Sequence, residues 1–325
     1  MKIVFCGLIG QGTSSLEHLI NAGIEVALVI TEPAEENTIL KKKLETIDNL
    51  SKHSLREYIK YNRIKDLCAK NKIEYIEVAN KSELIVLKEK IKTYNPEILA
   101  ASTFHLKIPA EILELFRYAI NVHPSLLPKY RGASPIMWAL VNNEKLTGVS
   151  VHLITDEYDA GDIIDQIQIP IDSEDTAATL SARIFDIYAP EILIRVLTNI
   201  KLSRITPKKQ NTAEASYFRK YTIDDSFIDF EKMEAQKICR IVKAGNYYYP
   251  AHFNLGEEII IIWNAEFIDR DFDGFAAGEI VGIAEDNNGL IVQTLKKSVN
   301  IKVLQKNLPT IAPLIFGRQL LELVK

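Results

Sequence analysis

Residues 121–132 read Asn-Val-His-Pro-Ser-Leu-Leu-Pro-Lys-Tyr-Arg-Gly, and they continue an apolar strand predicted over 119–122. Residues two apart in a strand point the same way, so Asn121 and His123 are expected side by side at its carboxyl end, where open α/β sheets place their sites. Two prolines and a glycine restrict the path of the following loop. An amide, an imidazole and a guanidinium on one rigid loop favour a functional site over a hydrogen-bonded core histidine.

The first two hundred residues alternate short apolar runs with amphipathic stretches. This is the pattern of parallel strands joined by crossover helices, and it predicts an α/β domain. The predicted strands are 2–6, 25–30, 74–78, 98–102, 119–122, 148–154 and 162–171, and the predicted helices are 13–22 and 176–202.

A length of 325 residues predicts about two domains. A proline and several polar residues interrupt the apolar periodicity over 201–215, so we place the boundary there, between a domain at 1–207 and a second at 208–325. The second part carries a helix signal at 232–244, a hairpin signal at 286–289 and several strand signals, which together predict a small β-barrel. The predicted strands are 258–263, 278–284, 290–295 and 299–304.

Composition excludes several classes of protein. Hydrophobic residues at 47% and charged residues at 25% are globular values, and a net charge of −4 gives no global attraction to nucleic acid. Cys6, Cys68 and Cys239 lie far apart without a CxxC pair, so neither a metal site nor a disulfide framework is predicted. With no signal peptide and no apolar run of membrane-spanning length, we expect a cytoplasmic protein without a membrane partner.

A glycine turn follows the first predicted strand. Gly10 and Gly12 come close to the dinucleotide fingerprint, and Glu32 stands where an acid that binds ribose would be expected. Ser15 replaces the third small residue, and any tight turn from strand to helix favours glycine. An NAD-dependent oxidoreductase is therefore a remote alternative. The charged stretch 32–73 is interpreted as a solvated face or loop.

A second polar loop lies at 155–162, where four carboxylates stand between two predicted strands. One of these acids near His123 would hold its imidazolium and select its tautomer. Asp159 and Asp162 are the better candidates, because Glu157 suits a solvated turn. No cysteine is near and Ser125 is separated from His123 by a proline, so these groups favour direct transfer over covalent catalysis.

The chain resembles the folate-dependent formyltransferase family. The resemblance rests on Asn121-Val122-His123, on 125–132 and on Asp159-Ala160-Gly161-Asp162, and it continues at 216–219 and 224–228. It implies a Rossmann-like domain followed by an OB-like β-barrel, with 10-formyltetrahydrofolate as formyl donor and no metal. It further implies a catalytic trio of Asn121, His123 and Asp159, and a pterin pocket lined by His105, Leu106, Lys107, Thr155, Asp156, Glu157 and Tyr158.

The acceptor amine is argued from charge. Residues 208–325 carry 15 basic and 16 acidic residues, a net of −1. Binding of tRNA normally needs a cationic surface, so a nucleotide-linked amino sugar is the first choice and methionyl-tRNA the second. The diphosphate of such a sugar is expected near Lys129 or Arg131. The residues expected to bind the acceptor are Ser125, Lys129, Tyr130 and Arg131. The oligomeric state is left open, with a homodimer among the options.

Overall fold

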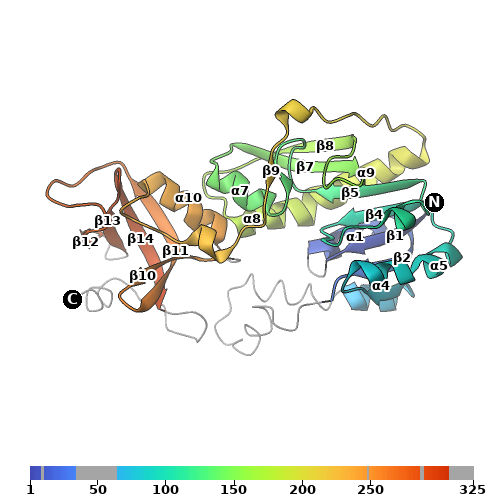
Figure 1. The fold of residues 1–325 in the computed structure, drawn as a ribbon, viewed down its shortest axis with the longest axis horizontal. Coiled ribbons are helices and arrows are strands. Elements are labelled where there is room, and N and C mark those ends of the chain that lie inside the picture. The colour runs from blue at the N-terminus through green and yellow to red at the C-terminus, as the bar shows by residue number, and fades with distance from the viewer. Residues whose placement is uncertain (9–10, 34–63, 247–248, 286–288, 307–325) are drawn as a thin grey trace. The chain divides into compact units, whose positions relative to one another are not determined.

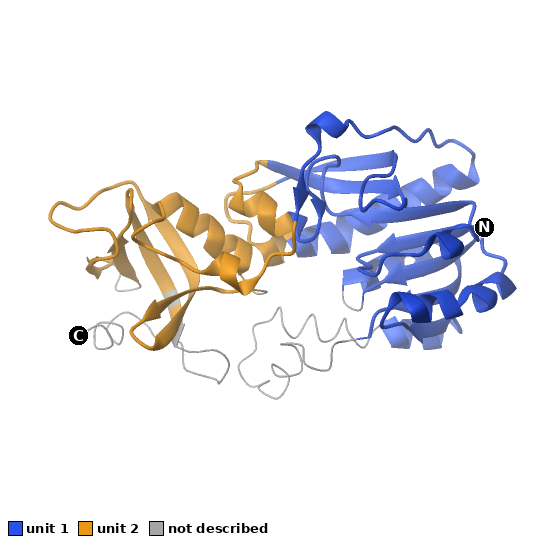
Figure 2. Ribbon diagram, in the orientation of Figure 1, with its two compact units in different colours: residues 1–135, 146–170, 181–218 blue, residues 136–145, 171–180, 219–325 orange. Residues whose placement is uncertain are grey.

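The structure is a computed structural model that describes residues 1–8, 11–33, 64–246, 249–285 and 289–306. The chain divides into two compact units (Figure 2): residues 1–135, 146–170 and 181–218 form unit 1, and residues 136–145, 171–180 and 219–325 form unit 2. The predicted turn at 286–288 and most of the charged stretch at 32–73 lie outside the described residues. None of the helices described has the length and apolar character needed to cross a bilayer.

Unit 1 is built on a seven-stranded sheet with the order β3-β2-β1-β4-β5-β7-β8 (Figure 1). The strands are β1 Lys2–Gly7, β2 Glu25–Thr31, β3 Glu74–Glu77, β4 Ile98–Ser102, β5 Tyr118–His123, β7 Leu146–Leu153 and β8 Ile163–Pro170. Strands β1 to β5 pair in parallel. The predicted α/β domain with a mainly parallel sheet is therefore confirmed.

The direction of the last two strands differs from the prediction of parallel strands. Strand β7 pairs antiparallel with β5, and β8 pairs antiparallel with β7. The loop at 154–162 is too short to carry a crossover, and a short loop joins antiparallel strands only. The apolar runs at 148–154 and 162–171 indicate strands but do not by themselves give their direction.

Helices cover both faces of this sheet. On one face α4 (Lys81–Val86), α5 (Lys88–Thr93) and α6 (Ala110–Leu113) bury Leu84, Ile91 and Ile112 against the strands. On the other face α1 (Gln11–Asn21) packs beside α9 (Ala189–Lys201). The predicted helix over 176–202 is realised as α8 (Ala177–Arg183), a π-helical turn (Ile184–Tyr188) and α9.

A two-stranded parallel ladder joins the loop after β5 to a distant segment. Here β6 (Arg131–Gly132) pairs with β9 (Tyr217–Phe218). Gly132 has φ +90°, and a Cβ on it would lie 2.4 Å from the carbonyl oxygen of Phe218. Only glycine combines this backbone conformation with so close an approach, so Gly132 lets the loop pass beside β9.

Unit 2 is centred on an antiparallel sheet with the order β10-β11-β14-β13-β12. Helix α10 (Ala235–Gly245) packs against it through Ile238, Ile241 and Val242. The strands are β10 Ala251–Leu255, β11 Glu258–Ile268, β12 Ile280–Ile283, β13 Leu290–Gln293 and β14 Ser298–Lys306. The pairing of β12 with β13 matches the predicted hairpin. Across the described residues β10 and β12 are sheet edges, so this part of the chain does not close into a barrel.

Helix α7 (Pro135–Val141) lies early in the chain, yet all but its first residue belongs to unit 2. The Trp138 indole N–H donates to the carbonyl oxygen of Arg219 at 2.8 Å, and its ring packs edge-on against Tyr221. Arg240 on α10 donates to the carbonyl oxygen of Val141 at 3.0 Å. Unit 2 is therefore assembled from separate stretches of chain.

We expect Leu99→Ala to lower the free energy of unfolding of unit 1 by about 2–5 kcal/mol, because the Leu99 side chain of β4 is buried in the core and only 1% exposed. Leu202→Ala removes the same atoms from a side chain that is 50% exposed and should cost about 0.5 kcal/mol or less. Chemical denaturation followed by circular dichroism measures both. Equal losses in the two variants would contradict this assignment of the core.

Candidate active site

The ends of β5 and β7 carry the polar side chains of the site. Asn121 and His123 come from β5, and the antiparallel register sets His152 of β7 directly opposite Asn121. Asp159 reaches them from the 154–162 loop, where its backbone has φ +54°. His123 and His152 are 4% and 2% exposed. The site thus holds two buried imidazoles and one carboxylate.

The partners of His123 define its neutral tautomer. Its Nε2 lies 2.8 Å from the carbonyl oxygen of Tyr130, and its Nδ1 lies 3.4 Å from Oδ1 of Asp159. A carbonyl oxygen only accepts hydrogen bonds, so Nε2 carries the proton in neutral His123 and Nδ1 keeps its lone pair. Nδ1 is therefore the nitrogen available to take up a proton, and the carboxylate beside it would stabilise the resulting charge.

The partners of His152 likewise define its neutral tautomer, and one of them is Asn121. Its Nδ1 donates to the carbonyl oxygen of Leu153 at 2.8 Å, so in neutral His152 Nε2 is an acceptor. The Asn121 amide nitrogen lies 3.1 Å from Nε2 and donates to it. Nε2 also lies 3.5 Å from Oδ1 of Asp159. His152 therefore fixes which end of the Asn121 amide faces β7.

Asp159 is held between the two rings. Its Oδ2 accepts the Gly132 N–H at 2.9 Å, and Oδ1 faces both imidazoles. Burial would raise the pKa of Asp159, but His123 and His152, when protonated, and the Gly132 N–H together lower it to about 2. Burial lowers the pKa of His123, and the opposing effects of Asp159 and the Tyr130 carbonyl do not fully offset this. At neutral pH the carboxylate is thus ionised and His123 is neutral.

The residues expected to bind the acceptor occupy different positions in the loop. Ser125 is buried and donates to the carbonyl oxygen of Lys129 at 2.7 Å, while the Lys129 side chain is exposed. Tyr130 is buried and stacks on Phe218 with ring centroids 4.8 Å apart. Ser125 and Tyr130 therefore shape the loop, and Lys129 faces solvent.

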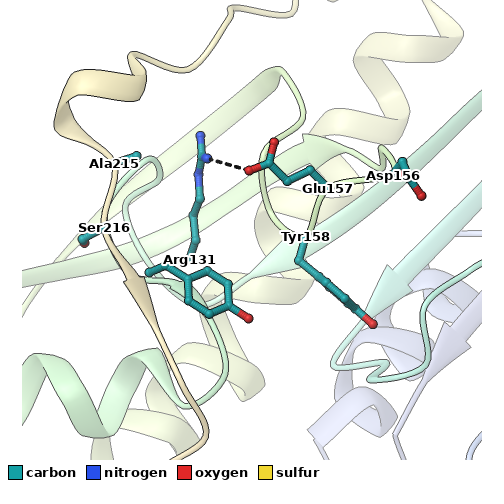
Figure 3. Close-up of a pocket in the computed structure, with 7 residues that line it drawn as sticks. Arg131, Asp156, Glu157, Tyr158, Ala215 and Ser216 are labelled. Atoms are coloured by element: carbon teal, nitrogen blue, oxygen red, sulfur yellow. Dashed lines mark ion pairs between the residues drawn. The ribbon is translucent and has the colours of Figure 1, made fainter.

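Arg131 is 7% exposed and is joined to Gln210. Its Nε and Nη2 donate to Gln210 Oε1 at 3.0 and 2.7 Å, and its Nη1 lies 3.9 Å from Glu157. Figure 3 shows Arg131 and Glu157 facing each other. Most of the Arg131 guanidinium is therefore already engaged by the protein.

The two segments expected to line a pterin pocket are linked. Lys107 forms an ion pair of 2.6 Å with Asp156. Thr155 donates to the carbonyl oxygen of Glu157 at 3.0 Å, which folds its own loop. Tyr158 is 50% exposed. The structure thus brings 105–107 and 155–158 together.

The Glu32 carboxylate is already hydrogen-bonded within the protein and is not available to bind a ribose. Its Oε1 accepts the backbone N–H groups of His105 at 2.5 Å and Leu106 at 3.3 Å, so the carboxylate anchors this loop. A Cβ on Gly7 would lie 2.7 Å from the Phe5 ring, which gives this glycine a packing role. Gly10 lies outside the described residues. The contacts of Glu32 therefore assign its carboxylate to local structure and not to a dinucleotide.

A pocket of about 450 Å³ opens beside the Asp159 loop (Figure 3). Its volume falls in the range of small-molecule sites. Both tyrosines that line it are well exposed, at 50% for Tyr158 and 66% for Tyr217. The lining residues are Arg131, Asp156, Glu157, Tyr158, Ala215, Ser216 and Tyr217.

Comparison with known families assigns both parts of the chain. Residues 1–197 match the model described as "Formyl transferase", and residues 220–311 match "Formyl transferase, C-terminal domain". The chain belongs to the formyl transferase family.

The relatives of this formyl transferase fall into two groups. The methionyl-tRNA formyltransferase of Thermodesulfovibrio yellowstonii is 33% identical over 98% of this chain and 97% of its own length. That of Buchnera aphidicola is 31% identical over 94% and 91%. Among solved structures, the N-formyltransferase from Helicobacter canadensis, in complex with folinic acid and dTDP-3-aminofucose, has a TM-score of 0.65 at 21% identity, over 93% of this chain and 99% of that one.

The formyl transferase has two buried side chains in the site that sequence reasoning missed. His152 was missed because its place opposite Asn121 depends on the β5–β7 register. Gln210 was missed because it lies in the stretch 201–215, where we place the domain boundary, and it falls between the two ranges that match the family. The available clue to His152 was a titratable side chain inside the strand signal at 148–154. Within the described residues no cluster of ligating side chains is arranged to hold a metal ion.

We expect His123 to be neutral at pH 7 and to titrate below the usual 6.5, because burial opposes its charging. Asp159→Asn should lower the pKa of His123 further, since the carboxylate charge raises it. Folding stability linked to His123 is present above pH 6.5 and is lost as the pH falls toward the lower pKa of the folded state. Titration of the His123 Cε1–H signal by NMR measures both. A higher pKa in Asp159→Asn would contradict the assigned pairing.

Proposed function

We propose that this formyl transferase moves the formyl group of 10-formyltetrahydrofolate to the amine of a nucleotide-linked amino sugar. In this proposal Asn121, His123 and Asp159 act on the reacting atoms. The observation that carries it is the position of the ionised Asp159 carboxylate, 3.4 Å from the unprotonated Nδ1 of His123. A buried base beside a fixed negative charge suits the removal of a proton from an attacking amine.

His123 takes the central part in this chemistry. The new bond joins the acceptor nitrogen to the formyl carbon, and the bond from that carbon to the folate nitrogen breaks. Nδ1 of His123 accepts the proton that the acceptor amine loses, while Nε2–H stays bonded to the Tyr130 carbonyl. Asp159 stabilises the imidazolium during this interval, and His123 then returns the proton to the departing nitrogen.

Asn121 supplies a donor for the developing charge. Its amide nitrogen has two hydrogens, of which one is directed at Nε2 of His152. The second hydrogen is the donor we assign to the formyl oxygen, on which negative charge develops. A preorganised amide donor of this kind typically contributes about 10²–10³ in rate. His152 keeps that amide from rotating.

The folate, when bound, supplies a formyl group on a nitrogen that can leave. We propose that 105–107 and 155–158 hold it, because the ion pair between Lys107 and Asp156 shows that these two segments lie beside each other. Tyr158 offers an exposed aromatic face next to them. The N–H groups of His105 and Leu106 already donate to Glu32, so recognition there would use other backbone groups.

The amino sugar is favoured over a macromolecule by charge and size. The pocket beside Asp159 has the volume of a small-molecule site, and its rim carries Asp156 and Glu157. Residues 208–325 have a net charge of −1. A diphosphate needs only one or two local cations, such as exposed Lys129, whereas tRNA needs an extended basic surface.

A methionyl-tRNA acceptor is the second candidate. The observation that favours it is the identity of 31–33% with methionyl-tRNA formyltransferases over more than nine-tenths of the chain. A nucleotide-linked amino sugar and an aminoacyl-tRNA both present a primary amine, so the chemistry at His123 would be the same for either.

For the architecture we propose a catalytic domain over 1–207 and an OB-like barrel over 208–325. The five antiparallel strands of unit 2 and its helix α10 support the second part. Contacts group residues 208–218 with unit 1, so the functional site extends past the proposed boundary.

We expect His123→Asn and Asp159→Asn to lower formyl transfer by about 10²–10⁴, because both remove a group that acts on the transferred proton. Turnover and melting temperature are measured together. The control is His18→Asn, which makes the same change on the exposed face of α1 and should keep wild-type turnover. Wild-type turnover in either site variant would refute the assigned roles.

We expect the acceptor to be found among nucleotide-linked amino sugars. The enzyme is incubated with 10-formyltetrahydrofolate and, separately, a panel of such sugars and charged initiator methionyl-tRNA. Mass spectrometry detects the added formyl group. Formylation of the tRNA with every sugar inert would replace the first candidate by the second.

A further inference from the structure

Gln210 lies in a segment that looks like a linker but is held inside unit 1. Lys208 forms an antiparallel bridge with Ile163, and this bridge joins the segment to the start of β8. Gln210 follows two residues later and is 9% exposed. A charged and polar stretch of sequence therefore delivers one buried amide to the site.

The amide of Gln210 makes four hydrogen bonds. Its Nε2 donates to the carbonyl oxygens of Asp159 at 2.8 Å and Gly161 at 2.7 Å. Its Oε1 accepts from Nε and Nη2 of Arg131. Arginine only donates and a carbonyl only accepts, so the orientation of the amide is fixed by its partners. Both donor hydrogens and both acceptor positions are used.

The two carbonyls belong to the turn that carries the Asp159 carboxylate. Asp159 has φ +54°, in the left-handed region that is uncommon for residues other than glycine. Gly161 is pressed against β7, since a Cβ there would lie 1.8 Å from the carbonyl oxygen of Leu153. Gln210 thus holds the turn from one side while β7 holds it from the other.

No other common side chain has this bonding pattern at this length. Glutamate would keep the contact with Arg131 but could not donate to the two carbonyls, and methionine would make none of the four bonds. Either change leaves buried carbonyls without their partner, and such groups move toward solvent when they can.

We propose that Gln210 is a positioning residue for formyl transfer, which holds the backbone of 159–161 so that the Asp159 carboxylate stays beside His123. The proposal rests on the roles assigned to His123 and Asp159. Gln210 acts through the turn and does not contact the reacting atoms. Arg131 in turn orients Gln210, which gives the buried guanidinium a part in the same positioning.

The test compares Gln210→Met and Gln210→Glu with a matched control, Gln168→Met, which makes the same change at an exposed position on β8. The groups facing His123 are Asp159, the Tyr130 carbonyl and His152, with Arg131 and Glu157 beyond them. Without Gln210 to hold the backbone of 159–161, the Asp159 carboxylate can move away from His123. We therefore expect the pKa of His123 to fall in Gln210→Met, as measured by NMR without folate or acceptor.

Activity gives the second readout. A displacement of about 1 Å at a reacting group can cost about 10² in rate. We expect kcat to fall by about that factor in both Gln210 variants while the KM for the folate stays near the wild-type value. In an Asp159→Asn background, Gln210→Met should leave the His123 titration unchanged, because the carboxylate through which it acts is gone.

Several results would overturn the proposal. An unchanged His123 titration in Gln210→Met, whatever the activity, would show that Asp159 is not held by this residue. Loss of cooperative melting in both Gln210 variants, with Gln168→Met intact, would make Gln210 a stability residue only. If instead His123→Asn kept wild-type turnover, the assigned catalytic roles would be wrong. The titration of His123 in the Gln210 variants would still show whether Gln210 holds Asp159 in place.

Discussion

Asp159 places a negative charge 3.4 and 3.5 Å from nitrogens of two buried imidazole rings, and the rest of the site is arranged around that charge. Each ring donates its one proton to a backbone carbonyl, of Tyr130 or Leu153, so each keeps a lone pair on the side of the carboxylate. The lone pair of His152 already accepts the Asn121 amide, so Nδ1 of His123 is the position left for one additional proton. A reaction in which a proton leaves one nitrogen and later joins another needs such a temporary acceptor.

The surrounding chain is folded so that this charge is both buried and fixed. Gly132 contributes an N–H from β6 because its φ of +90° turns the loop beside β9. Glu32 anchors the 105–107 loop, and Lys107 reaches from there to Asp156 next to the same turn. Much of what looks like loop in this formyl transferase is thus tied by hydrogen bonds to one end of its sheet.

Sequence reasoning located the strands of unit 1, and it placed His123 near Asp159, because these signals are local. The apolar run 98–102 coincides with β4, and His123 at the end of β5 lies beside Asp159 of the 154–162 loop, as expected. It missed what depends on pairing between distant segments. The direction of β7 sets His152 opposite Asn121, and only the bridge at Lys208 shows that Gln210 turns inward. Neither follows from composition or periodicity.

The assembly of unit 2 from separate stretches has a consequence for how such a protein can evolve. Helix α7 precedes β7 in the chain, yet the Trp138 indole N–H bonds to the backbone of Arg219 and Arg240 bonds back to Val141. Recombination near residue 207 would therefore bring in a C-terminal sheet without the α7 helix to which these two hydrogen bonds join it.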